Sequence, residues 1–111
     1  EVTRQPRRLA FGRGPLPDGS ELELRGGPLE DELRALAADG VKSLLLEGGP
    51  TLAAAFLAEG LVDKLLFFIA PVLAGEGPRA IGDLGAPVEL LHARAEPSGE
   101  DVLLEAYLHE P

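Results

Sequence analysis

The sequence predicts an α/β domain with a mixed, mostly parallel sheet that is flanked by helices and ends in an antiparallel hairpin. Apolar runs of strand length alternate with segments of helical periodicity, which is typical of a sheet covered by helices. Two more strand candidates follow near the C-terminus, and the short turn between them allows only antiparallel pairing. At 111 residues, the whole chain 1–111 fits a single domain.

The first part of the chain predicts two short strands and a helix. Arg7–Phe11 is a strand candidate, closed by the glycines and prolines of residues 12–19. Polar and apolar residues alternate in Glu21–Leu24, as in a brief edge strand. The helix is expected to have Pro28 at its first position, leucines at helical spacing and Gly40 at its C-terminal cap.

The centre of the chain predicts a buried strand followed by a second helix. Val41–Leu46 is an apolar run broken by only two polar residues, which suits a strand of a parallel sheet covered on both faces. Thr51–Glu59 is predicted to be a short helix that Gly60 stops. This strand–turn–helix unit carries the candidate site.

The last part of the chain predicts a strand, a loop and a hairpin. Asp63–Ala70 is a second strongly apolar strand, and Pro71–Pro87 is a loop rich in glycine and proline. Val88–Ala95 and Val102–His109 are strand candidates separated by the turn Glu96–Glu100.

Charge and composition exclude several classes of function. The formal net charge of −9 argues against nucleic acid, because phosphate contacts need clustered Lys and Arg. We interpret the basic cluster near the start as the solvated flank of a strand; it consists of Arg4, Arg7, Arg8 and Arg13. No apolar run could cross a bilayer and no signal peptide is visible, so we expect a cytoplasmic protein without a membrane partner. The chain has no cysteine, and His92 and His109 lack ligand spacing, so no metal site is expected.

The most informative stretch joins the strand candidate 41–46 to the helix that follows. Glu47 lies where open α/β sheets place their ligands, and it either accepts hydrogen bonds from a substrate or caps the helix or pairs with an arginine. Gly48 and Gly49 serve either a phosphate site or simply positive φ or close packing. Thr51 either donates its hydroxyl to a phosphate or caps locally. Free N–H groups and the helix dipole favour negative charge at such a helix start, so this turn is a candidate phosphate site.

Other polar residues have more ordinary interpretations. Asp63 and Lys64 indicate a turn and an exposed charge pair, and Tyr107 indicates packing on a terminal strand. Gly75–Pro78 is either a ligand-facing loop or, as we favour, an ordinary surface turn. The sequence contains no Ser-His-Asp set, no Walker loop and no evident nucleophile, so no catalytic residue is assigned. If the protein is an enzyme, a bound cofactor is therefore expected to supply the chemistry.

Several motifs in combination resemble those of one enzyme family. In chain order they are Val41–Leu52 with its Glu47-Gly48-Gly49-Pro50-Thr51 turn, Phe56-Leu57, Gly60–Leu65, Ile69–Leu73, Gly75 and Gly99–Val102. This combination resembles the C-terminal reductase domain of the bifunctional riboflavin-biosynthesis deaminase/reductases. The resemblance runs from about Pro6 to the end of the chain and indicates the C-terminal part of a longer reductase domain, without the deaminase half.

The resemblance implies a dihydrofolate-reductase-like fold and a specific reaction. The reaction is the NADPH-dependent reduction of 5-amino-6-(5-phosphoribosylamino)uracil to its ribitylamino form, with Glu47 facing this phosphoribosylaminopyrimidine substrate. The residues implied to line the cofactor site are Gly48, Gly49, Pro50, Thr51, Leu52, Ala53, Ala54 and Ala55. We also expect a homodimer. Two alternatives stay open: a reductase of another heterocycle on the same fold, and a non-catalytic structural or dimerisation module whose apolar strands, such as Leu65–Ala70, pack against a partner chain or the missing half of the domain.

Overall fold

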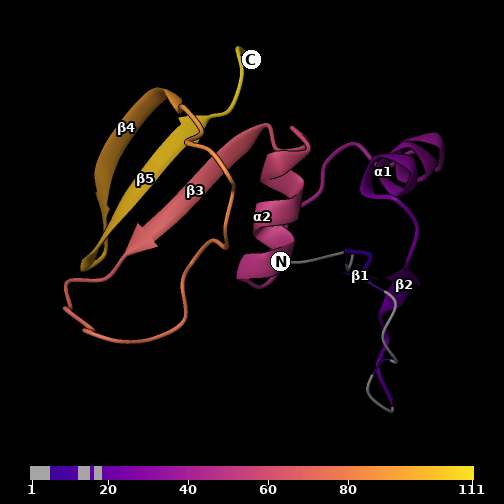
Figure 1. The fold of residues 1–111 in the computed structure, drawn as a ribbon, viewed down its shortest axis with the longest axis horizontal. Coiled ribbons are helices and arrows are strands. Elements are labelled where there is room, and N and C mark those ends of the chain that lie inside the picture. Colours follow the sequence, from indigo (N-terminus) through magenta and orange to yellow (C-terminus); the bar gives the residue numbers. More distant parts are fainter. Residues whose placement is uncertain (1–5, 13–15, 17–18) are drawn as a thin grey trace. The chain divides into compact units, whose positions relative to one another are not determined.

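The computed structural model describes residues 6–12, 16 and 19–111, and the chain divides into two compact units. Unit 1 comprises residues 1–45 and unit 2 comprises residues 46–111. The order of elements is β1, β2, α1, α2, β3, β4, β5 (Figure 1). Within the described residues, no helix is long and apolar enough to span a membrane.

Unit 1 contains a small parallel sheet and a helix. Strand β1 (Leu9–Phe11) pairs in parallel with β2 (Glu23–Arg25), and the sequence predicted both strands. Helix α1 (Leu29–Ala38) follows Pro28, which is its N-cap rather than its first residue. Three acidic residues in the first turn of α1 complement its dipole, and Gly40 leaves the helix with a φ of 92°.

One member of the early basic cluster is a structural residue. Arg7 donates two hydrogen bonds to the Glu23 carboxylate, at 3.0 and 2.8 Å, and its guanidinium lies 3.7 Å from Asp39. The bond from Arg7 holds the pKa of Glu23 below its usual value, and the same contact raises the pKa of Arg7. Arg7 is therefore half-exposed yet links β2 to the end of α1, while Arg4 and Arg13 lie outside the described residues.

Residues 41–46 do not form the predicted strand, so the prediction of a mostly parallel sheet is wrong. A parallel strand exists only where neighbouring strands accept its N–H groups and donate to its carbonyls. Val41 donates instead to the Leu36 carbonyl at 3.0 Å, as a bond that closes the end of α1. Leu44 and Leu45 are 40% and 76% exposed. The apolar run satisfies the composition of a buried strand, but composition does not supply the neighbours that a strand needs.

Unit 2 is built on a three-stranded antiparallel sheet. Its strands are β3 (Lys64–Ile69), β4 (Leu91–Ser98) and β5 (Asp101–Tyr107), in the order β3-β5-β4 (Figure 1). The predicted hairpin of β4 and β5 is confirmed. The hairpin turn is tighter than predicted, because pairing continues to Ser98 opposite Asp101 and Gly99 supplies a φ of 62°. The chain is thus a mixed α/β structure with one parallel and one antiparallel sheet.

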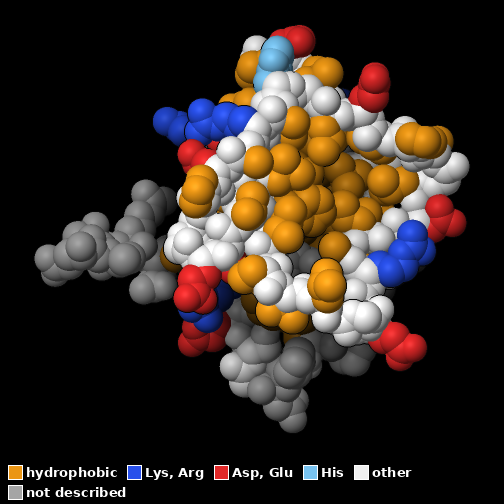
Figure 2. Space-filling model, turned by 90° about the vertical axis from the view of Figure 1, so that its left-hand side faces the viewer, with side chains coloured by type: hydrophobic (Ala, Val, Ile, Leu, Met, Phe, Trp, Pro, Cys, Tyr) orange, Lys and Arg blue, Asp and Glu red, His pale blue; other side chains and the backbone are white. Residues whose placement is uncertain are grey.

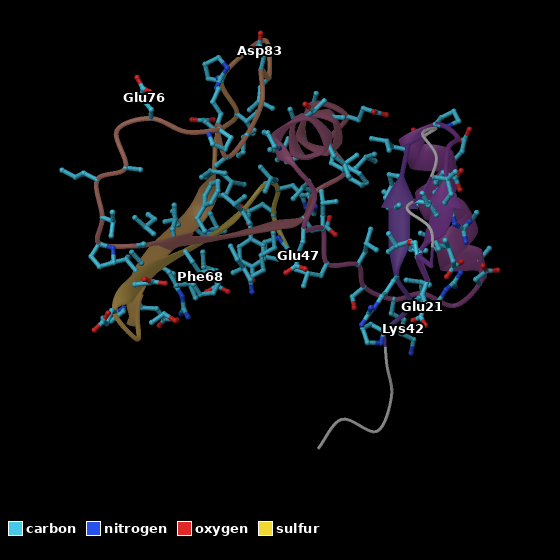
Figure 3. All side chains as sticks on the ribbon, turned by 90° about the horizontal axis from the view of Figure 1, so that it is seen from below. Glu21, Lys42, Glu47, Phe68, Glu76 and Asp83 are labelled. Carbon is cyan, nitrogen blue, oxygen red and sulfur yellow. The ribbon has the colours of Figure 1, made fainter. Side chains whose placement is uncertain are left out.

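Helix α2 (Pro50–Ala58) provides most of the buried side chains of unit 2. It lies beside β3 in both ribbon views (Figures 1 and 3). Phe56 is 2% exposed and Ala54 is 7% exposed, and Ala106 on the central strand β5 is fully buried. The helix whose first turn carries the candidate site thus has its own buried side chains in unit 2.

A large apolar surface of unit 2 stays uncovered. Figure 2 shows hydrophobic side chains gathered across the side of the molecule that carries β4, β5 and the connection from β3 to β4. The exposed large apolar residues of unit 2 are Leu66, Phe68, Ile69, Val72, Leu73, Val88, Leu90 and Val102. Phe68 projects from the side of the sheet opposite to the loop that carries Glu76 and Asp83 (Figure 3). Monomeric soluble proteins rarely expose contiguous apolar patches of this kind without a functional reason.

Candidate functional site

The first turn of α2 leaves two backbone donors free. Gly49 is the N-cap with an extended backbone (φ −71°, ψ 176°), and its carbonyl accepts the N–H of Ala53 at 3.0 Å. Pro50 has no N–H to satisfy. In the described part of the chain, the N–H groups of Thr51 and Leu52 donate to no protein group. These two donors and the positive end of the helix dipole favour an anion, and the first turn contains no acidic residue that would oppose one.

The two glycines of the turn have different structural reasons. Neither has a positive φ, which rules out backbone conformation as the reason for either glycine. A Cβ on Gly48 would lie 2.7 Å from Cδ2 and 3.2 Å from Cβ of Leu52, so an added methyl group would crowd this side chain. A Cβ on Gly49 would meet nothing within 4 Å, so the space beside Gly49 is open. Both glycines are exposed, but only Gly49 has room for an added Cβ.

Glu47 and Thr51 are exposed at this turn, and their side chains form no hydrogen bond or ion pair among the described residues. No side chain caps the N-terminus of α2, and the carboxylate of Glu47 forms no ion pair within the described chain. The hydroxyl of Thr51 likewise forms no hydrogen bond there. The alternatives of a helix cap or an arginine pair for Glu47, and of a local cap for Thr51, therefore find no support in this geometry.

The predicted cofactor residues of α2 do not all face the same environment. Thr51 is exposed, and Leu52, Ala53 and Ala55 are half-buried. Ala54 is buried, so its side chain packs in the interior of unit 2 and only its backbone is near the turn. The structure thus brings Glu47 and the residues through Ala55 together as one continuous turn and helix start.

One neighbour of this turn has no counterpart in the sequence prediction. The N–H of Gly82 donates to the carbonyl of Pro50 at 2.9 Å, which joins the long connection between β3 and β4 to the first turn of α2. Gly82 falls inside the loop predicted from Pro71 to Pro87, whose role the sequence left open. Figure 3 shows that Asp83 and Glu76 on this loop lie far from Glu47. Nothing in the local sequence distinguishes Gly82 from the other loop glycines, because its contact is with a residue distant along the chain.

Asp63 and Lys64 each contact the end of the chain or β5 rather than one another. The Asp63 carboxylate lies 2.6 Å from Nε2 of His109, and the Asp63 carbonyl accepts the N–H of Leu108 at 3.1 Å. The hydrogen bond to Asp63 raises the pKa of His109 above its ordinary value, with a smaller contribution from the Glu110 carbonyl. These contacts hold the C-terminal residues against the start of β3.

Lys64 belongs to an ion-pair network on the sheet. Its ammonium lies 2.5 Å from Glu105 and 5.5 Å from the centre of the Tyr107 ring, and Arg94 donates to the other oxygen of Glu105 at 3.0 Å. The hydrogen bond from Lys64 lowers the pKa of the Glu105 carboxyl. These cross-strand pairs connect β3, β5 and β4, which agrees with a structural interpretation of Tyr107.

Neither histidine belongs to a cluster with metal-binding geometry. His92, at the irregularity of β4 with a φ of 53°, lies 2.9 Å from the Glu110 carboxylate, and its ring meets Tyr107 edge-on at 6.4 Å. Within the described residues, no group of three or more His, Cys, Asp or Glu side chains could hold a metal ion.

These features describe a mixed α/β structure with a candidate anion site at the start of α2, and solved structures share its fold. The RibD of Acinetobacter baumannii, in its form 2, superposes with a TM-score of 0.75 over 92% of this chain and 37% of that chain, at 23% sequence identity. A crystal structure of a Shewanella sp. PV-4 protein assigned to riboflavin biosynthesis gives a TM-score of 0.78 over 96% of this chain and 62% of that chain, at 24% identity.

The sequence comparisons identify the family. The family model of the RibD C-terminal domain matches residues 23–104. The riboflavin biosynthesis protein RibD of Aquifex aeolicus is 36% identical over 88 residues, which cover 75% of this chain and 24% of that protein. The RibD of Corynebacterium ammoniagenes is 40% identical over 81 residues, 66% of this chain and 24% of that protein. The chain belongs to the RibD C-terminal domain family, and it spans about a quarter of the length of these relatives.

Proposed function

We propose that this chain forms part of the active site of an NADPH-dependent pyrimidine reductase of riboflavin biosynthesis with a dihydrofolate-reductase-like fold. The proposed reaction reduces 5-amino-6-(5-phosphoribosylamino)uracil to its ribitylamino form. The observation that carries the proposal is the start of α2, where two free backbone N–H groups follow Glu47 and Gly49, and the space beside Gly49 is open. The chain that contains this turn belongs to the RibD C-terminal domain family. NADPH supplies the hydride for such a reduction.

The residues present fit the phosphate of such a cofactor. The N–H groups of Thr51 and Leu52 donate to a phosphate oxygen, and the hydroxyl of Thr51 is free to add a third bond. The open space beside Gly49 lets the anion approach the backbone closely. The Glu47 carboxylate, exposed and unpaired among the described residues, accepts hydrogen bonds from the polar substrate and orients it.

The role of Glu47 is tested by Glu47→Gln in the full-length protein. The amide keeps the size of the side chain but removes its charge and half of its acceptor capacity. We expect NADPH-dependent turnover to be lost while the dissociation constant of NADPH stays unchanged. Glu59→Gln is the matched control, because Glu59 is an exposed carboxylate at the other end of α2. Unchanged turnover in Glu47→Gln contradicts the proposed role of Glu47.

The phosphate site is tested independently by Thr51→Glu. A carboxylate in the first turn of a helix stabilises the helix through its dipole, but here it would occupy the position proposed for the phosphate. We expect NADPH binding, measured by nicotinamide fluorescence, to weaken at least about tenfold, which corresponds to about 1.4 kcal/mol. The melting temperature should stay the same or rise, so a loss of binding cannot be attributed to unfolding. Equal affinity in both proteins would exclude this turn as the phosphate site.

A second candidate function, self-association as a homodimer, is favoured by the exposed apolar surface of unit 2. Phe68 and Ile69 on β3 are 60% and 52% exposed, and Val72 just after the strand is 73% exposed. Burying such side chains between two copies would stabilise a dimer. Sedimentation equilibrium should show a dimer that Phe68→Lys converts to a monomer, and a monomeric wild-type protein would exclude this candidate.

A further inference from the structure

The connection between β3 and β4 is anchored to the first turn of α2 at one short segment. Among residues 71–90, the half-buried positions are Ile81, Gly82 and Leu84, and the other positions are exposed. The N–H of Gly82 donates to the Pro50 carbonyl at 2.9 Å. This long connection, which is exposed elsewhere, is therefore held at Pro50. Pro50 directly precedes Thr51 and Leu52.

Gly82 packs closely against the first turn of α2. A Cβ at this position would lie 3.1 Å from the Pro50 oxygen and 3.4 Å from Cβ of Ala54. The first distance is shorter than ordinary van der Waals contact, and the atom it meets is backbone, which cannot rotate away. Gly82 does not have a positive φ, so its backbone conformation does not require glycine.

The segment around Gly82 has its own internal support. The Asp83 carboxylate accepts the N–H of Gly85 at 2.9 Å, which closes a short turn directly after the anchor. Gly85 adopts a φ of 77°, a conformation that glycine tolerates. This turn begins at the residue directly after Gly82, whose N–H donates to Pro50.

We propose that residues 81–85 position the anion-binding turn, with Gly82 as the positioning residue. By holding the Pro50 carbonyl, Gly82 determines where the N–H groups of Thr51 and Leu52 point. Residues 81–85 do not contact the ligand; they keep two donors aligned for it. This inference rests on the proposed function only for the identity of the ligand, since the alignment itself is a property of the free protein.

The test compares Gly82→Ala with Ala80→Ser in the full-length protein. Both variants add one heavy atom to the same loop, but Ala80 is exposed and Gly82 faces Pro50. In ¹⁵N-labelled protein without cofactor, we expect Gly82→Ala to shift the amide signals of Thr51 and Leu52 and Ala80→Ser to leave them in place. NADPH titration should show roughly tenfold weaker binding for Gly82→Ala, because small misplacements of binding groups reduce productive contacts on that scale.

A second variant separates positioning from loss of folding. Asp83→Ala removes the support of the turn at an exposed position and adds no atom to the contact with Pro50. It should shift the same two amide signals, by less, without changing the melting temperature. Amide signals of Thr51 and Leu52 that match the wild type in both Gly82→Ala and Asp83→Ala would overturn the positioning role. If both variants shift these amide signals but the wild-type protein does not bind NADPH, the positioning role is upheld and the proposed function is refuted.

Discussion

The glycine pair that precedes α2 allows a sharp test of the structure, because its two members predict opposite responses to the same substitution. In Gly48→Ala the new methyl group would lie 2.7 Å from Cδ2 of Leu52. That terminal atom can rotate away, but Cβ of Leu52 at 3.2 Å belongs to the helix and moves only with it. In Gly49→Ala the new methyl group meets nothing within 4 Å.

The expected magnitudes follow from these distances. Overpacking of this kind costs about 1–3 kcal/mol, and the reduced entropy of the unfolded chain returns about 0.4–1 kcal/mol, so Gly48→Ala should destabilise by about 1 kcal/mol. Gly49→Ala gains the same entropy but loses a favourable N-cap residue, and the two effects roughly cancel. A difference of about 1 kcal/mol changes the unfolding equilibrium constant about fivefold.

Urea unfolding followed by far-ultraviolet circular dichroism measures this difference, since the chain contains no tryptophan. A double-mutant cycle with Leu52→Ala identifies its cause. If the contact with Leu52 is responsible, Gly48→Ala and Leu52→Ala should couple by about 1 kcal/mol, with the double variant more stable than the sum of the single effects. Equal destabilisation by Gly48→Ala and Gly49→Ala, or the absence of coupling with Leu52→Ala, would show that the contact with Leu52 does not constrain Gly48.

Two further predictions concern the core and the C-terminal contact. Phe56→Ala should lower the free energy of unfolding in urea by about 3–5 kcal/mol, because Phe56 is 2% exposed. Phe68 is 60% exposed, so Phe68→Ala should change the free energy of unfolding of the monomer by less than about 0.5 kcal/mol. Similar losses in the two variants would mean that α2 does not carry the core. The Asp63 carboxylate raises the folded pKa of His109 above 6.5, so this contact stabilises the fold below pH 6.5 and is lost as pH rises through the raised pKa. Asp63→Asn should lower the NMR titration midpoint of His109, and an unchanged midpoint would exclude this contact as the cause.

Local signals in the sequence were sufficient for several elements. Pro50 and Gly60 bracket α2 at both ends, because each acts on the backbone of its own helix. The pairing of β4 with β5 follows from a turn so short that only antiparallel strands can flank it. Such elements depend on residues near one another in the chain, which is why periodicity and turn residues predict them.

Residues 41–46 are an apolar run for which local sequence signals do not predict the structure. Their apolar run predicts a buried strand, yet β3 pairs with β5 and the run has no strand beside it in the described chain. The prediction of a mostly parallel sheet depended on that strand. Whether an apolar segment becomes a strand is decided by hydrogen-bonding partners that the segment itself does not contain.

By itself, the sequence determined the family resemblance and the position of the turn from Glu47 to Thr51. Both depend on short motifs whose residues are neighbours in the chain. Only the tertiary structure decided which glycine is constrained and what holds the turn. Gly48, which precedes the N-cap of α2, is crowded by Leu52 in the first turn of that helix, whereas Gly82 reaches Pro50 from a loop 32 positions further along the chain. Contacts between distant segments are set by packing, and no local pattern in the sequence records them.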